Sequence, residues 1–216
     1  MSYTSQRKSS GFSLIELLIT LGILIITLTI ALPGFREFFD RERLINATEE
    51  VYGMLQKARM ESMARSDEMY VKFASSNGSW AYGLAEVEPC DPTIEDPTLK
   101  FACVITVDDG DQIAVEDLSD PTEADKEKQE DRVFVRFTKD SHPEISLDLD
   151  ESTEIIENTE TIFEFNPIRG TVDAITGSTS ITLVSALDKR LRVTVSPLGN
   201  VGICSPNGEI PSYKDC

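Results

Sequence analysis

Histidine is almost missing from this chain, and basic side chains are few relative to acidic ones. Its 216 residues include 20 Lys and Arg against 38 Asp and Glu, which gives a formal net charge of −18. Such a surface repels nucleic acid unless a local basic patch overrides it. The single histidine, His142, stands beside Pro143 and far from any cysteine, and no CxxC pair is present. Both features argue against a zinc site.

Catalytic motifs are missing as well. The chain contains no G-x-S-x-G, no HExxH and no Walker loop. Acidic pairs such as Asp148 and Asp150 are more typical of a solvated strand face than of glycosidase chemistry. Gly170 and Gly177 indicate a hairpin rather than a phosphate cradle. The sequence therefore predicts a non-enzyme that needs no cofactor and holds no metal.

One long apolar segment dominates what is present. Residues 11–32 read GFSLIELLITLGILIITLTIAL, and about twenty such residues cross a bilayer core as a helix. A charge at mid-bilayer costs roughly 2.5–3.5 kcal/mol, so Glu16 is expected to have a partner and a function. A cleaved secretory signal would have a shorter apolar region followed by an A-x-A site, and this segment has neither feature. A generic single-pass anchor fits the length but leaves Glu16 unexplained.

The Gly11-Phe12 junction, Glu16 and the apolar run together resemble the class III leader of type IV pilins and type II secretion pseudopilins. The resemblance implies that a prepilin peptidase removes residues 1–11 on the cytoplasmic side. It also implies that the new N-terminus, Phe12, is methylated. Glu16 occupies the position of the family's glutamate, which pairs with the terminal amine of a neighbouring subunit. That pair would lie in low dielectric and favour correct axial register.

The charges around the segment agree with this topology. Arg7 and Lys8 precede the apolar run, whereas residues 36–43 mix both signs. Positive residues on the short side favour a cytoplasmic N-terminus. We therefore expect a single-pass protein of the bacterial inner membrane with a periplasmic C-terminal domain, or a subunit incorporated into a filament. Loss of the two cations with the leader changes the side-chain charge from −18 to −18 − 2 = −20.

Beyond the membrane run, a helical pattern resumes. Pro33 matches the family's helix-kinking proline. Spacings of three, four and seven predict an amphipathic helix. Its packing face is expected to contain Phe35, Phe38, Phe39, Leu44, Ala47, Val51, Leu55, Ala58 and Ser62. Residues 1–11 are thus predicted to be the leader, 12–33 the transmembrane half of one helix and 34–66 its soluble half.

Short β-type runs fill the remaining residues, 67–216. They read MYVKF, WAYGLAEV, CVITV, VFVRF, ISLDL, TIFEF, ITLVS and RLRVTV. They predict one β-rich domain of two packed antiparallel sheets, with the soluble half-helix laid against one sheet. The fold class is therefore α+β.

An acidic run at 108–131 interrupts the β-type pattern. It is expected to be a solvated insertion between strands. Calcium binding by Asp108, Asp109 and Asp111 is the alternative, although their spacing does not match an EF-hand loop.

All four cysteines lie in the β-rich region, at Cys90, Cys103, Cys204 and Cys216. Four cysteines allow three pairings, and the sequence alone does not choose among them. Proximity favours Cys90–Cys103 and Cys204–Cys216, each closing a loop of roughly a dozen residues. Disulfides fit an oxidising periplasm.

The tail, LRVTVSPLGNVGICSPNGEIPSYKDC, resembles the end of the GspH/FimT group of minor pilins and pseudopilins. The resemblance implies a subunit that initiates or caps a type IV pilus-like filament. Its partners would be other pilins or pseudopilins, the prepilin peptidase and an inner-membrane assembly platform. The alternative is a minor pseudopilin of a type II secretion system. The tail cysteines and the Ser-Pro-Leu-Gly turn favour the assignment to a pilus.

A role at the filament tip, in DNA uptake or adhesion, is the third hypothesis. Some FimT-like proteins bind DNA through a Gly-Arg-x-Arg motif in this tail. The corresponding residues here, Gly199-Asn200-Val201-Gly202, include neither arginine. The loss of two phosphate-binding cations argues against DNA uptake, whereas adhesion stays open.

Overall fold

The computed structural model describes residues 12–76, 78–86, 89–97, 99, 101–106, 132–149, 159–176 and 180–216. The predicted leader with Gly11, the acidic run 108–131 with its candidate calcium ligands, Asp150 and Gly177 lie outside the described residues. The chain divides into two compact units, residues 1–39 and 40–216.

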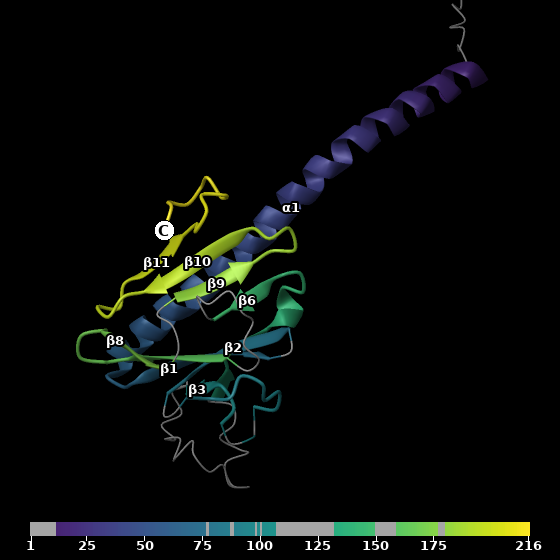
Figure 1. The fold of residues 1–216 in the computed structure, drawn as a ribbon. Helices are drawn as coiled ribbons and strands as arrows, with labels where there is room; N and C mark the ends of the chain where they lie inside the picture. The colour runs from purple at the N-terminus through teal and green to yellow at the C-terminus, as the bar shows by residue number, and fades with distance from the viewer. Residues whose placement is uncertain are drawn as a thin grey trace, which may run out of the picture. The chain divides into compact units, whose positions relative to one another are not determined.

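One helix, α1 (Leu14–Arg65), contains both the apolar run and the predicted soluble half-helix (Figure 1). It is bent between Thr29 and Gly34, the interval that includes Pro33. A proline inside a helix removes one backbone hydrogen bond, and its ring clashes with the carbonyl of the preceding turn. The predicted kinked helix is therefore confirmed.

The second half of α1 packs on the β-strands through a single face. Its members are at most 1% exposed: Leu44, Ala47, Val51, Leu55, Ala58 and Ser62. The prediction is wrong for Phe35, Phe38 and Phe39, which are 57%, 50% and 53% exposed. The step from Phe39 to Leu44 is five residues, which turns a helix by about 140°. By helical periodicity the three rings thus belong to the arc opposite the packing face.

Within the described residues the strands form three antiparallel sheets, whose arrangement can be followed in Figure 1. The larger sheet has the order β5-β2-β1-β7-β8, the second has β11-β10-β9-β6, and β3 pairs with β4. The first sheet comprises β1 (Met69–Ser76), β2 (Ser79–Ala85), β5 (Arg136–Thr138), β7 (Thr159–Phe165) and β8 (Val172–Thr176). The others are β6 (Ser146–Asp148), β9 (Ser180–Val184), β10 (Arg190–Val195), β11 (Val201–Cys204), β3 (Val104–Thr106) and β4 (Arg132–Phe134). A 3-10 turn, η3 (Lys139–Ser141), follows β5.

The two predicted antiparallel sheets are present, and the short β3–β4 ladder is additional. It arises because the VFVRF run is not one strand: β4 ends at Phe134 and β5 begins at Arg136. Val135 lies between them, and its N–H donates to Cys103 O at 2.8 Å while its carbonyl accepts from Leu84 N at 3.1 Å. One residue thereby joins the small ladder to β2.

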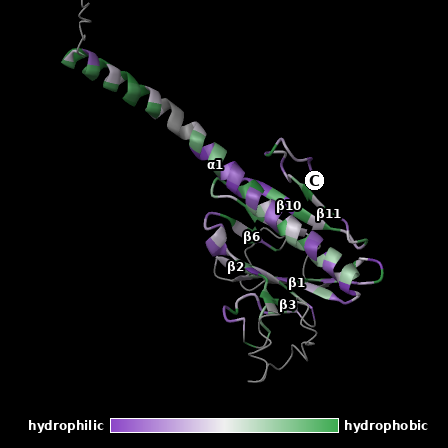
Figure 2. Cartoon of the chain, turned by 180° about the vertical axis from the view of Figure 1, so that it is seen from behind, coloured by the Kyte–Doolittle hydropathy of each residue, from purple (hydrophilic) through white to green (hydrophobic). Residues whose placement is uncertain are grey.

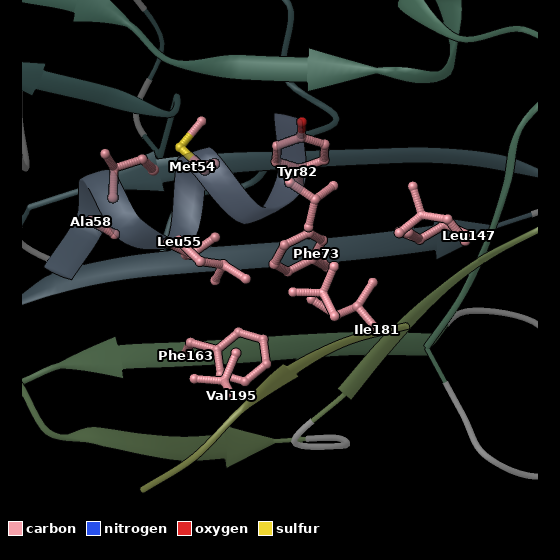
Figure 3. Packing of buried hydrophobic residues seen from close by; sticks show 14 of the residues in the cluster. Met54, Leu55, Ala58, Phe73, Tyr82, Leu147, Phe163, Ile181 and Val195 are labelled. Carbon is pink, nitrogen blue, oxygen red and sulfur yellow. The ribbon is translucent and has the colours of Figure 1, made fainter. Parts of the chain in front are cut away.

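Both sheets and the helix share one hydrophobic core (Figure 3). Aromatic side chains form its centre on the larger sheet. The Tyr82 ring stacks on Phe73 at 5.1 Å and on Phe137 at 5.1 Å between centroids. Phe163 meets Phe73 edge to face at 6.1 Å. Truncating a buried phenylalanine to alanine typically costs about 3–5 kcal/mol, so these rings are main contributors to the stability of the β-rich unit.

Two turns from different sheets meet beside the C-terminal part of α1. The β7–β8 turn contains Gly170 at φ 58°, and the β10–β11 turn contains Gly199 at φ 75°. Val172 N–H, at the start of β8, donates to Pro197 O at 3.0 Å. A Cβ on Gly199 would overlap the carbonyl of Gly170, so glycine is required at Gly199 by both conformation and space.

The structure contains two disulfides, Cys90–Cys103 and Cys204–Cys216. These are the pairs that sequence proximity favours. The second holds the C-terminal tail against β11, and the tail also reaches α1, where Tyr213 OH donates to Glu49 Oε1 at 3.0 Å. Ile210 anchors the tail in the core with no exposed surface.

Candidate assembly interface

The first part of α1 presents apolar side chains in every direction. Its large apolar side chains, together with Phe12 just before the helix, are at least half exposed: Leu14, Ile15, Leu17, Leu18, Ile19, Leu21, Ile23, Leu24, Ile25, Ile26 and Leu28. Figure 2 shows this part of the helix as predominantly hydrophobic, whereas in its later turns hydrophobic and hydrophilic residues alternate. A contiguous apolar surface of this size marks a contact with lipid or with another protein.

Polar groups within the run are satisfied by the helix itself. The hydroxyls of Thr20, Thr27 and Thr29 donate to the carbonyls of Leu17, Leu24 and Ile26 at 2.9, 2.9 and 2.8 Å. Serine and threonine in helices commonly bond back in this way. These three hydroxyls therefore enter an apolar environment already paired, as burial in lipid requires.

Glu16 is the exception, as the only charged residue between Phe12 and Phe35. It lies in the first turn of α1, where Ser13 O accepts from the Glu16 and Leu17 N–H groups at 3.1 and 3.2 Å. A carboxylate in the first turn is stabilised by the helix dipole. Its side chain is exposed, and no cation among the described residues lies within ion-pair distance. The carboxylate is thus available to a group outside the described chain.

Among the described residues no single helix is long and apolar enough to cross a membrane, but the bent pair Leu14–Thr29 and Gly34–Arg65 qualifies by length and composition.

Several polar contacts hold the other half of α1 to the β-rich unit. Three of them, at successive positions along the helix, involve the buried or half-buried carboxylates of Asp40, Glu50 and Glu86. Nearest its start, Asp40 is 6% exposed and accepts from Ser185 Oγ at 2.6 Å and from Leu187 N at 3.3 Å. Ser185 and Leu187 belong to the β9–β10 loop. A buried carboxylate is tolerated when such donors satisfy it.

At the middle level, the Glu50 carboxylate receives two partners. Tyr82 OH donates to Glu50 Oε1 at 3.1 Å, and His142 Nε2 lies 2.9 Å from Glu50 Oε2. Burial, followed by the nearby Glu50 charge, raises the pKa of Tyr82, which keeps its hydroxyl a donor. His142 N–H also closes η3 by donating to Lys139 O at 2.9 Å. The lone histidine therefore has a structural role in a turn.

At the far level, Arg65 ends α1 beside Glu86. Arg65 Nη1 lies 2.6 Å from Glu86 Oε1 and also donates to Thr106 O. Glu86 is 8% exposed and accepts from Thr106 N and Oγ1 at 2.9 and 2.7 Å. The helix end, β2 and β3 are joined through this one carboxylate. These three attachments were not predicted, because each pairs residues far apart in the sequence.

The predicted site residues fall into two groups. Phe12 lies two residues before α1, Glu16 lies in the first turn of α1, and Pro33 lies within α1 near its bend. The cysteines lie in the β-rich unit. In the tail, Arg190 Nη2 contacts Asp188 Oδ1 at 3.2 Å and Arg192 Nε donates to Thr182 Oγ1 at 3.2 Å, so both arginines are engaged within the protein.

Two known families match separate parts of the chain, one at the N-terminal apolar run and one over the rest of the helix and the β-strands. Residues 6–32 match the prokaryotic N-terminal methylation motif, and residues 47–199 match the family described as type II transport protein GspH. No curated protein and no solved structure matches the chain. The second match covers most of the chain, including the helical packing face from Ala47 onward and every described strand except β11, and the chain therefore belongs to the GspH family of type II transport proteins.

Proposed function

We propose that this chain is a non-enzymatic minor pseudopilin, a subunit that joins a short pilus-like filament through α1 and helps to initiate or cap it. The observation that carries the proposal is the exposed apolar helix with one carboxylate, Glu16, in its first turn. The apolar surface needs neighbours, and the carboxylate needs a cation. Other subunits of the same kind supply both, since each contributes an apolar helix and a terminal amine.

Before assembly the subunit resides in the inner membrane, with its N-terminus in the cytoplasm and residues 67–216 in the periplasm. The match to the methylation motif supports cleavage between Gly11 and Phe12 by a prepilin peptidase, followed by methylation of Phe12. The positive-inside rule supports the orientation. The two disulfides agree with an oxidising compartment.

In the filament, Glu16 pairs with the terminal amine of a neighbouring subunit. An isolated carboxylate in an apolar environment is costly, and an ion pair in the right register removes that cost. A subunit displaced along the filament axis by a turn would leave both charges without a partner. The pair thus selects the register, and apolar packing between helices provides most of the attraction.

Two machines are candidates. The family description favours type II secretion, whereas the β10–β11 turn with its Pro197-Leu198-Gly199 sequence and the Cys204–Cys216 bridge resemble pilus-type members. Cross-linking of the tagged chain in living cells, followed by mass spectrometry, distinguishes them. Pseudopilins and secretion-platform proteins are expected among the products. Recovery of pilins and other minor pilins would assign the chain to a type IV pilus, and recovery of neither group would contradict the proposal.

A further inference from the structure

The aromatic cluster Phe35, Phe38 and Phe39 belongs neither to the buried core nor to the apolar run. Its rings contact one another, with centroids 6.5 Å apart for Phe35–Phe39 and 5.7 Å for Phe38–Phe39. Each ring is at least 50% exposed. At about 100° per residue, the three positions span an arc of roughly 100°, and Glu37 falls on the opposite arc. One turn of α1 is thus amphipathic, directly after a run that is apolar on all sides.

The length of the apolar run places this turn relative to a bilayer. At 1.5 Å per residue, the helix from Leu14 to Leu32 is about 29 Å long, which matches a hydrocarbon core of roughly 30 Å. The next one to two turns therefore coincide with the headgroup region on the periplasmic side. The bend between Thr29 and Gly34 allows the following turn to leave the direction of the span.

We infer that the aromatic cluster is a lipid-binding face, which lies in the phospholipid headgroup region while the subunit waits in the membrane. Amphipathic helices bind there with the apolar side toward the acyl chains and the charged side toward water. The cluster continues the apolar surface of the run, so the same bilayer that covers the run reaches it. This inference rests on the membrane-resident stage of the proposed function. It adds a contact that fixes the depth of the subunit before extraction.

Tryptophan fluorescence in vesicles of brominated phosphatidylcholine tests this inference on the full-length chain. The native Trp80 is 3% exposed in the core of the β-rich unit, so the wild-type protein supplies the baseline. Single variants add a second tryptophan: Phe35→Trp in the cluster, Glu37→Trp on the opposite arc and Leu24→Trp inside the run. Each is measured with bromine near the headgroup or near the chain end.

We expect Phe35→Trp to lose its added emission mainly to bromine near the headgroup, and Leu24→Trp mainly to bromine near the chain end. Glu37→Trp should be quenched less than Phe35→Trp. If Leu24→Trp is quenched and Phe35→Trp is not, the lipid contact is wrong and the cluster belongs to a protein neighbour. Equal quenching of Phe35→Trp and Glu37→Trp would also overturn the assignment of this face. Absence of quenching in Leu24→Trp would instead reject the membrane-resident stage itself, and this inference with it.

Discussion

The Ser185 hydroxyl donates a 2.6 Å hydrogen bond to the buried carboxylate of Asp40, although 145 residues separate them. Leu187 N–H donates to the other carboxylate oxygen. Asp40→Ala would leave both donors without this acceptor, and a lost hydrogen bond to a charged group costs about 1.5–3 kcal/mol. We expect a loss of that size in urea unfolding of the detergent-solubilised chain. Ser185→Ala should cost less, since Leu187 N–H still serves the carboxylate, and the reverse order would contradict this account.

Substitution of glycine by alanine should change the free energy of unfolding in opposite directions at two positions, Gly83 and Gly53. A Cβ on Gly83 would lie 2.5 Å from Cys103 Cβ, closer still to its sulfur, and 3.0 Å from Val135 O. Overpacking of this kind costs about 1–3 kcal/mol, so Gly83→Ala should lower the free energy of unfolding. Gly53 lies in α1 with nothing within 4 Å of a new Cβ, and Gly53→Ala should raise it by about 0.5–1 kcal/mol. A stabilised Gly83→Ala protein would show that β2 and the disulfide are not tightly packed.

The contact between the tail and α1 should depend on pH. Partial burial, followed by the hydrogen bond to Glu49, raises the pKa of Tyr213 from 10.0 to about 12. A group whose pKa is raised on folding stabilises the fold below its unfolded pKa and loses that contribution as pH increases through the folded value. The difference in unfolding midpoint between wild type and Tyr213→Phe should therefore shrink from about pH 10 to 12. A constant difference across this range would refute the contact.

Removal of the charge in the first turn of α1 should affect assembly but not insertion. Glu16→Ala removes the partner proposed for the neighbouring terminal amine, while it makes the run more apolar and easier to insert. We expect filament formation to fall strongly, with the variant still in the membrane fraction. Glu209→Ala, an exposed carboxylate in the tail, provides the control and should assemble normally. Normal filaments from Glu16→Ala would exclude the charge pair.

Processing should depend on the residue before Phe12. Gly11→Ser should block removal of the leader, which leaves a larger band in the membrane fraction. Gly34→Ser changes a glycine with no neighbour within 4 Å of a new Cβ and should be processed as in the wild type. A mature-sized band from Gly11→Ser would reject cleavage at this junction.

The sequence predicted those elements whose signal is local. The apolar run and the periodicity through Ala58 define α1, and alternation defines β1, β7 and β10. The packing of Phe35 and Phe39 was predicted wrongly because their own spacing is helical. Only the five-residue step to Leu44 reveals the change of face.

Elements that depend on distant partners were missed. β8 is a short run that becomes a strand by pairing with β7. Similarly, the carboxylates of Asp40 and Glu86 resemble solvated charges in the sequence, since nothing nearby indicates that Ser185 or Thr106 will satisfy them. The exposed part of α1 with Glu16 was predictable because its signal lies in one continuous stretch of sequence. The contacts that hold the other half of α1 to the sheets were not predictable, because each depends on a residue far away in the sequence.

Cys216 in the tail is bridged to Cys204, twelve residues earlier. Residues 204–216 therefore form a covalently closed ring. A protease that cuts one peptide bond inside this ring opens it without releasing a fragment, because the bridge keeps both new ends on the same molecule. Damage to this segment would be invisible on a non-reducing gel and would be detected only after reduction.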